Sequence, residues 1–372
     1  MTLSFRSIDD VPAEEWDELV QTSPDGWVFG LHGWQRLVAD VEAWGFVDNG
    51  FGVYEGDRLQ AVVPLHLQPS SNIAGSSGWG GSGPVIRGSL PPERRQQVFR
   101  AAVARMIEIA EAAGAIRLDV SSSPVTASSI GSRWAINPFA LLGFDDSSLI
   151  SQVISLEPSE SDLWHALSKT ARNLVRRGEK AGFRVEPADW LISLDAYYDI
   201  HVETYARTGV APHPKRYFEG IATAIAPSGA SRLLALISPD GEPVAFHGTV
   251  QFGNGANYHI GCSRTAVQSL SPSYLLMWEA IKAAKASGAG WFDVGWIFPA
   301  TDDRKQKGLT HFKTRFGGEP HRSFRAELGM VTRVDRTEPT VDEAPGIRDR
   351  TFAIAGRFAR RARRFLAAGT PP

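Results

Sequence analysis

Residues 110–120, AEAAGAIRLDV, and residues 284–294, AKASGAGWFDV, are two versions of one pattern. They are identical at two alanines, at a glycine with the alanine after it, and at a closing Asp-Val pair. Each predicts a helix that ends at a glycine C-cap, followed by a short apolar strand that ends in aspartate. We interpret the similarity as an internal duplication. The alternative is a chance similarity between two alanine-rich helix ends.

The segments that flank the two copies favour duplication. A β-hairpin is predicted before each copy, with strands at 51–54 and 59–67 in the first half and at 233–237 and 243–252 in the second. Helical material opens each half, at 13–20, 34–41, 163–181 and 194–207. In the second half, Ser271 is expected to cap the helix that Pro272 begins. The order helix, helix, hairpin, strand, helix, strand therefore occurs twice.

The composition is that of a globular protein with room for two cores. The chain has 372 residues, of which 43% are hydrophobic, and its formal net charge is −2, so no global field recruits nucleic acid. The single cysteine, Cys262, excludes an internal disulfide and fits a reducing compartment. The sequence shows no signal peptide and no apolar stretch long enough to span a bilayer. These features predict a cytoplasmic protein.

A lysine between aromatic residues stands out near the end of the second half. Phe312 and Phe316 are four residues apart and share a face of a helical turn, whereas Lys313 points elsewhere. A cation held next to a rigid apolar anchor suits a site that handles phosphate or a developing oxyanion. Taken alone, the segment is more typical of a solvated lysine beside two core phenylalanines.

The order of elements resembles the GNAT acyltransferase fold, and the duplication resembles the tandem units of FemAB-like aminoacyltransferases. The resemblance covers about residues 10 to 335 and is carried by Glu15-Trp16, residues 80–84, 169–182 and 258–263, Asp293-Val294-Gly295, and Phe312-Lys313 before Gly317-Gly318. It implies an α/β (α+β) protein of two tandem GNAT-like units, each a mixed, mostly antiparallel sheet flanked by helices. The units are expected at 1–150, with 318–335 completing the first, and at 151–317. A linker and a basic amphipathic helix are expected at 336–372.

The resemblance also implies an activity. In this family the amine of a cell-wall precursor or similar acceptor attacks an activated acyl carbonyl in a groove between the two halves. Phe312 and Lys313 match the motif whose lysine stabilises the negative charge of the tetrahedral intermediate. The donor is expected to be aminoacyl-tRNA or acyl-CoA, with no tightly bound cofactor. Residues 268–273 lack the glycine-rich turn that cradles the pyrophosphate of CoA, and Pro272 removes one amide donor, which favours another donor.

Other candidate site residues each have a structural alternative. Asp293 is a candidate catalytic carboxylate or a cap for the turn after its strand. Candidates for lining the groove or binding substrate phosphates are Tyr258, His259, Arg207, Arg216, Lys169, Arg172 and Arg176. A solvated basic face is the usual explanation of the last three. Cys262 and His259 are expected on opposite faces of one strand, which excludes a catalytic pair. No spacing of histidine or cysteine predicts a metal site.

Three questions stay open at the level of sequence. Residues 347–368 carry seven arginines on a predicted amphipathic helix, which either contacts an anionic membrane surface or RNA, or docks on the body of the protein. The acceptor is a small molecule or a lipid-linked envelope precursor, and DNA is not expected as a partner. Rival functions are CoA-dependent N-acylation of an amino-sugar or small amine, and a non-catalytic scaffold that binds a glycan or partner.

Overall fold

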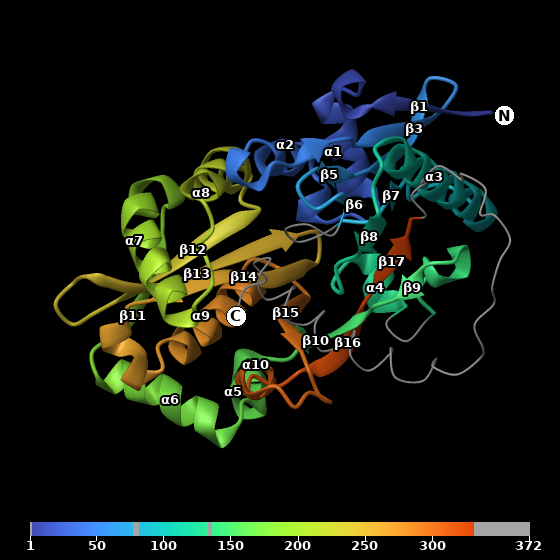
Figure 1. Ribbon diagram of the computed structural model, residues 1–372. Coiled ribbons are helices and arrows are strands. Elements are labelled where there is room, and N and C mark those ends of the chain that lie inside the picture. The colour runs from blue at the N-terminus through green and yellow to red at the C-terminus, as the bar shows by residue number, and fades with distance from the viewer. Residues whose placement is uncertain (1, 77–81, 133–135, 331–372) are drawn as a thin grey trace, which may run out of the picture.

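The computed structural model describes residues 2–76, 82–132 and 136–330. The linker and C-terminal helix predicted for 336–372 lie outside these residues, as do residues 80 and 81 of the glycine-rich segment 80–84. Figure 1 shows two α/β halves, with strands β15, β10, β16 and β17 between them.

In the described part of the first half there are two sheets and four α-helices. The sheets have the strand orders β1-β3-β4-β7 and β2-β5-β6-β8-β17-β9. The strands are β1 (Leu3–Ser7), β2 (Val47–Asp48), β3 (Phe51–Glu55), β4 (Arg58–Val63), β5 (His66–Gln68), β6 (Ile73–Gly75), β7 (Val85–Ile86), β8 (Arg117–Ser121) and β9 (Asp145–Asp146). The helices are α1 (Ala13–Thr22), α2 (His32–Ala39), α3 (Pro92–Ala112) and α4 (Ala127–Gly131).

The second half is built on one seven-stranded sheet of order β11-β12-β13-β14-β15-β10-β16, in which only β14 and β15 pair in parallel. Its strands are β10 (Leu149–Ser155), β11 (Arg184–Ala188), β12 (Ser231–Ile237), β13 (Pro243–Phe252), β14 (Gly255–Ser263), β15 (Trp291–Ile297) and β16 (Glu319–Ser323). β17 (Arg325–Gly329) crosses into the first half and pairs with β8 and β9. The helices are α5 (Glu160–Ala166), α6 (Lys169–Lys180), α7 (Trp190–Thr208), α8 (Lys215–Gly220), α9 (Ser273–Ala286) and α10 (Arg304–Thr314).

The duplication is visible in strand register. In the first half, the parallel pairing of β6 and β8 ends at Gly75 opposite Asp119. In the second half, the parallel pairing of β14 and β15 ends at Asn257 opposite Asp293. The two aspartates of the repeated sequence therefore occupy equivalent places. They are not strand ends, as the sequence predicted, because β8 continues to Ser121 and β15 to Ile297.

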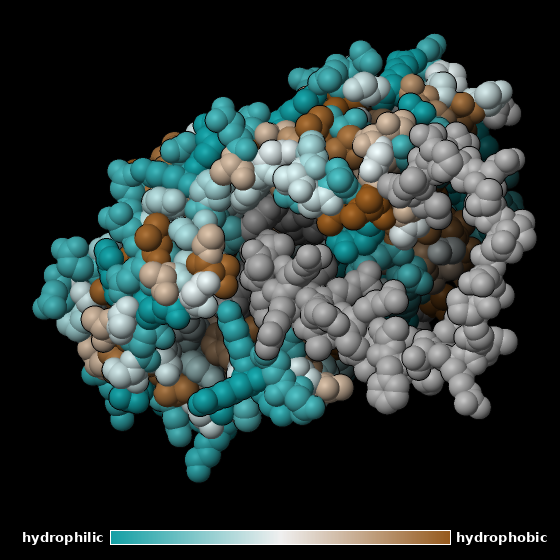
Figure 2. Space-filling model, in the orientation of Figure 1, coloured by the Kyte–Doolittle hydropathy of each residue, from teal (hydrophilic) through white to brown (hydrophobic). Residues whose placement is uncertain are grey.

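One hydrophobic core joins the halves. It packs Trp16 and Trp34 of the first half with Tyr217, Phe218 and other residues of the second half, and all four side chains are almost fully buried. Two further cores lie within the halves. A continuous apolar interface of this kind fixes the halves relative to one another. On the face drawn in Figure 2, hydrophobic residues occur in separate patches on a largely hydrophilic surface.

Three local predictions were wrong. The helix expected over 163–181 is two helices, because Ser168 caps a new one through its bond from the Ala171 amide. The strand expected over 59–67 is divided between β4 and β5, which belong to different sheets. Ser271 does not cap α9: it has a left-handed backbone with φ of 53°, and Pro272 occupies the cap position.

Candidate active site

Helix α10 places Lys313 against the sheet. Asp303 caps the start of the helix, accepting from the Gln306 amide at 2.9 Å. At its other end, the rings of Phe312, Phe316 and Tyr274 pack with centroid distances between 5.0 and 5.5 Å. This aromatic anchor fixes the helix, so Lys313 lies on the inner side and is only 6% exposed. The alternative of a solvated lysine is therefore wrong.

The Lys313 ammonium lies over the end of β15. Its Nζ donates to the carbonyl oxygen of Trp296 at 2.9 Å, which is its one hydrogen bond among the described residues. A Cβ atom on Gly295 would stand 2.9 Å from that Nζ, and Gly295 has φ of 101°, so only glycine fits there. Burial lowers the pKa of Lys313 to about 8, and the nearby charge of Asp293 opposes this shift. Two N–H groups of the Lys313 ammonium make no hydrogen bond among the described residues, so they can donate to a ligand.

Asp293 is held by neutral donors. Its Oδ1 accepts from the Ser151 hydroxyl at 2.6 Å and from the Gly295 amide at 2.7 Å, and its Oδ2 accepts from the Asn257 amide group at 3.0 Å. Burial raises the pKa of Asp293, while these donors and the charge of Lys313 lower it. The carboxylate and the ammonium thus interact at the point where β14 and β15 stop pairing.

Tyr258 and His259 are both partly buried but face different cores. The ring of Tyr258 packs 4.7 Å from that of His247 on the side of α9. His259 shares a hydrogen bond of 2.9 Å with the Tyr217 hydroxyl and contacts Phe29 of the first half. Burial lowers the pKa of His259 to about 3, so it is neutral at physiological pH. His259 therefore belongs to the interface between the halves.

The expectation that His259 and Cys262 lie on opposite faces was wrong. The pairing of β13 with β14 shifts register at His259, because Gly248 pairs with Ile260 and Thr249 with Tyr258. This β-bulge turns His259 toward the same core as Cys262. The two do not form a catalytic pair, since the Cys262 thiol lies 3.7 Å from the carbonyl oxygen of Tyr197 and burial raises its pKa.

The two arginines predicted to clamp phosphate have different surroundings. Arg207 donates to the Ser263 carbonyl at 2.7 Å and to the Thr265 hydroxyl at 2.9 Å. Arg216 is exposed and lies near Asp40 and Glu219. The structure does not bring them together on one ligand position.

Helix α6 presents only part of the predicted basic face. Arg172 donates to the carbonyl oxygens of His165 and Leu167 and so caps the end of α5. Arg176 lies over the Trp164 ring, 5.2 Å from its centroid. Lys169 and Arg176 are exposed. Arg172 thus has a structural role, whereas the other two cations can reach a ligand.

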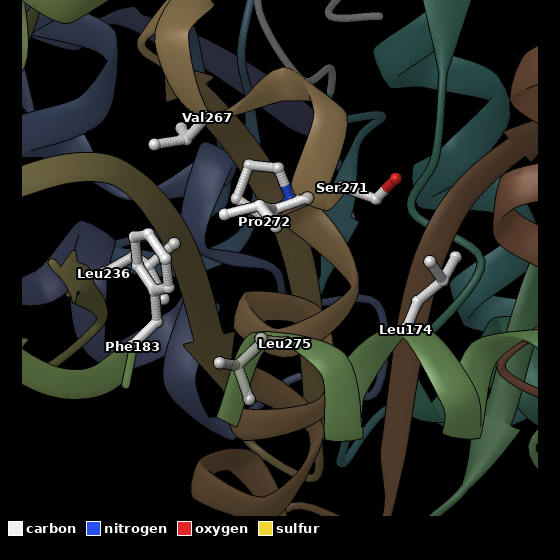
Figure 3. Close-up of a pocket in the computed structure, with 9 residues that line it drawn as sticks. Leu174, Phe183, Leu236, Val267, Ser271, Pro272 and Leu275 are labelled. Atoms are coloured by element: carbon white, nitrogen blue, oxygen red, sulfur yellow. The ribbon is translucent and has the colours of Figure 1, made fainter. Parts of the chain in front are cut away.

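The segment before α9 forms an apolar depression instead of an anion cradle. The pocket of about 240 Å³, which includes space open to solvent, is lined by Leu174, Gly178, Phe183, Leu236, Val267, Leu270, Ser271, Pro272 and Leu275. Figure 3 shows Pro272 and Leu275 at the start of α9 across from Leu174 on α6. Hydrocarbon groups therefore occupy the side of the helix N-terminus where a pyrophosphate would need polar donors.

Sequence reasoning missed several residues that shape the site. Ser151 and Asn257 bind Asp293 from strands 142 and 36 residues away, and no local pattern connects them. Trp296 acts through its backbone carbonyl, which any residue would supply. Gly295 could have been found, since a glycine directly after Asp293-Val294 is consistent with a positive φ.

In the described part of the chain, no helix combines the length and apolar character needed to cross a membrane. Nor do three or more His, Cys, Asp or Glu side chains come together there as a metal site.

Comparison with known proteins agrees with this architecture. Residues 166–314 match the family model described as acetyltransferase (GNAT) domain. No curated protein matches the chain in sequence. Among solved structures, FemX is similar at 15% identity and a TM-score of 0.66, covering 88% of this chain and 97% of FemX. A tandem GNAT protein from the clavulanic acid biosynthesis pathway has 13% identity and a TM-score of 0.54, covering 88% and 98%.

A third neighbour is the C-terminal domain of a candidate lysylphosphatidylglycerol synthetase from Agrobacterium fabrum. It has 16% identity and a TM-score of 0.50, covering 85% of this chain and 91% of that domain. At these identities the neighbours show the fold alone, which is that of tandem GNAT-like units. The part of the chain that matches the acetyltransferase (GNAT) domain model lies in the second half, and this match supports acyltransferase as the enzyme class.

Proposed function

We propose that this protein transfers an acyl or aminoacyl group to the amine of a cell-envelope precursor, and that Lys313 stabilises the oxyanion. The observation that carries the proposal is the buried Lys313 ammonium. Among the described residues it has one hydrogen-bond partner, the Trp296 carbonyl, and it lies beside Asp293 where β14 and β15 separate. The envelope precursor is suggested by the resemblance to FemAB-like enzymes and by the neighbours FemX and the synthetase domain.

The chemistry matches this arrangement. The nitrogen of the acceptor amine forms a bond to the acyl carbon, and the carbonyl oxygen takes up the electron pair. When the tetrahedral intermediate collapses, the bond to the donor's oxygen or sulfur breaks and the amine loses a proton. A fixed cation in a water-poor site is worth about 3–4 kcal/mol to such a developing charge. The two remaining donors of Lys313 would supply it.

Asp293 is the proposed proton acceptor. Its Oδ2 has only the Asn257 amide as a donor among the described residues, whereas Oδ1 has two. Burial raises the pKa of this carboxyl, which makes it a better base than an exposed aspartate. Ser151 and Asn257 would keep it oriented. Because Cys262 faces the core with a raised pKa, direct attack is preferred to a covalent intermediate.

The donor is proposed to be an aminoacyl ester such as aminoacyl-tRNA. The apolar surroundings of the α9 N-terminus argue against a CoA pyrophosphate in its usual place. The exposed cations Lys169 and Arg176 on α6 offer positions for donor phosphates. The alternative donor is acyl-CoA, which the acetyltransferase name of the matched domain favours.

The test is mass spectrometry of products from a donor-by-acceptor matrix. It pairs acyl-CoAs and aminoacyl-tRNAs with nucleotide-linked sugars, lipid-linked precursors and small amines, using wild type, Lys313→Met and Lys285→Met. Lys285 is a matched control because it also donates to a backbone carbonyl, that of Leu156 at 2.7 Å, near the start of β15. The proposal expects an N-acylated envelope precursor that Lys285→Met makes as wild type does and Lys313→Met makes at least about 10²-fold more slowly. Product from acyl-CoA alone would establish the alternative donor, and no product from any pair would favour a binding scaffold.

A further inference from the structure

The chain crosses from one sheet to the other next to the proposed site. β16 pairs with β10 in the seven-stranded sheet, and β17 pairs with β8 in the first half, with only Phe324 between them. Arg325 is the first residue of β17. Its backbone is held in the first half, since its carbonyl accepts from the Asn137 side chain at 2.8 Å and from the Ser147 amide at 3.0 Å.

The side chain of Arg325 reaches the strand that carries the site. Its guanidinium carbon lies 5.0 Å from the centroid of the Trp296 ring, within the range of a cation–π contact. The backbone carbonyl of the same Trp296 accepts the hydrogen bond of Lys313. One tryptophan therefore contacts two cations, through its ring and through its backbone.

This ring contact matters because of the residue before Trp296. Gly295 has φ of 101° and no side chain to pack, and the pairing of β15 with β10 shifts register next to it, between Gln152 and Val153. The backbone of Trp296 pairs with Ser151 of β10, and its ring adds a side-chain contact that holds the strand beyond this irregularity. Arg325 is 6% exposed, and burial lowers the pKa of its guanidinium, while the charges of Asp119 and Glu327 favour its charged form.

We propose that Arg325 is a positioning residue, which holds the Trp296 ring so that the Trp296 carbonyl keeps the Lys313 ammonium aimed at the separation of β14 and β15. The proposal rests on the proposed role of Lys313. Through this contact the first half sets the geometry of the cation in the second half. The rival explanation is that the aromatic anchor on α10 positions Lys313 without help.

The test compares Arg325→Met, Arg325→Lys and the matched control Arg322→Met. Arg322 lies 5.5 Å from the Phe324 ring centroid and pairs with Asp146 at 2.6 Å, so it makes the same kinds of contact away from Lys313. We expect Arg325→Met to lower kcat about 10-fold with little change in KM, because a small misplacement of a catalytic group is enough for such a loss. Arg325→Lys should recover part of kcat, and Arg322→Met should stay within about 2-fold of wild type.

A second readout needs no substrate. The titration midpoint of Lys313, followed by ¹³C NMR of its Cε, should move in Arg325→Met and stay in place in Arg322→Met. Trp296→Leu leaves all charges intact and should lower kcat as much as Arg325→Met does. If Arg325→Met fails to fold, Trp296→Leu tests the same contact. In a Lys313→Met background, Arg325→Met should cause no further loss.

Wild-type kcat and an unmoved midpoint in Arg325→Met would overturn the positioning role while leaving Lys313 untouched. A further loss in the Lys313→Met background would also overturn it, since Arg325 would then act by another route. Full activity of Lys313→Met alone would instead overturn the proposed function.

Discussion

Each half carries an aspartate at the equivalent place, Asp119 in β8 and Asp293 in β15, but the surroundings of the two differ. Asp119 and Asp293 are buried to a similar degree, with 6% and 4% of their surface exposed. Asp119 is paired with the Arg117 guanidinium at 2.6 Å and lies near the charges of Arg325 and Glu327. Asp293 has neutral hydrogen-bond donors, and Lys313 is the nearby cation.

The comparison indicates how a repeated scaffold can acquire one reactive site. In the first half the position opposite the aspartate is Gly75, where a Cβ atom would stand 2.4 Å from the Asp119 carbonyl oxygen, so no side chain fits. In the second half Asn257 stands there and holds the carboxylate. Arg117 and the other charges around Asp119 form a structural cluster, whereas Oδ2 of Asp293 has a single donor among the described residues, the Asn257 amide group. The aspartate is therefore proposed to be structural in one copy and catalytic in the other.

Exchange of each aspartate for asparagine gives the largest expected difference. Asp293→Asn should lower kcat about 10²–10³-fold, because proton transfer loses its base. Asp119→Asn should leave kcat within about 3-fold but lower the free energy of unfolding by about 1–3 kcal/mol, because a partly buried arginine loses its partner. Steady-state kinetics and urea unfolding of both variants measure this. Equal losses of kcat in the two would remove the functional contrast.

The pH dependence should separate activity from stability. With the pKa of Lys313 lowered to about 8, kcat should fall about 10-fold per pH unit above that value as the ammonium is lost. The free energy of unfolding should instead rise by up to about 3 kcal/mol between pH 8 and 10.5, because there the unfolded chain binds more protons at this lysine than the folded one. Comparison with Lys313→Met isolates the effect. If the difference in free energy of unfolding between wild type and Lys313→Met does not change between pH 8 and 10.5, the lowered pKa of Lys313 is contradicted.

Removal of the Asn257 side chain makes the second site more like the first. Asn257→Ala should lower kcat about 10-fold, because the Asp293 carboxylate loses one of its oriented donors. The KM for the donor should change little. Gln251→Ala is the control, because the side-chain amide of Gln251 bonds Ser287 and lies away from Asp293. The kinetics of the two variants are compared. If both variants behave alike, Asn257 has no specific role.

The smallest effect is expected at the single cysteine. Cys262→Ala should keep kcat within about 2-fold, since the thiol faces the core and is not needed for direct attack. Iodoacetamide should likewise leave the native enzyme active. A covalent acyl-cysteine trapped in wild type would reverse this part of the mechanism.

Much of this organisation could be predicted from the sequence, for physical reasons that are local. The Gly114 and Gly288 helix ends, the hairpin turn near Gly241 and the helical face shared by Phe312 and Phe316 depend on near neighbours in the chain, and the structure confirms them. The repeat was visible because its most constrained positions, a left-handed glycine and a buried Asp-Val pair, stayed the same.

The rest depends on contacts between distant segments. The β-bulge at His259 arises from pairing with β13, so alternation along the sequence put that side chain on the wrong face. The break at Leu167–Ser168 was hidden because the basic spacing of the following helix continued the apparent pattern. The contacts from Ser151 to Asp293 and from Arg325 to Trp296 require the assembled sheets, and no local signal predicts them.

The most direct test of the central claim is the single-turnover rate of Lys313→Met with the donor and acceptor identified by product analysis. Wild type and Lys285→Met are measured beside it at pH 7, where Lys313 is mostly charged. The account predicts a rate at least about 10²-fold lower for Lys313→Met, with donor and acceptor binding within about 3-fold of wild type. A rate for Lys313→Met within about 3-fold of wild type would contradict the assignment of Lys313 to the oxyanion.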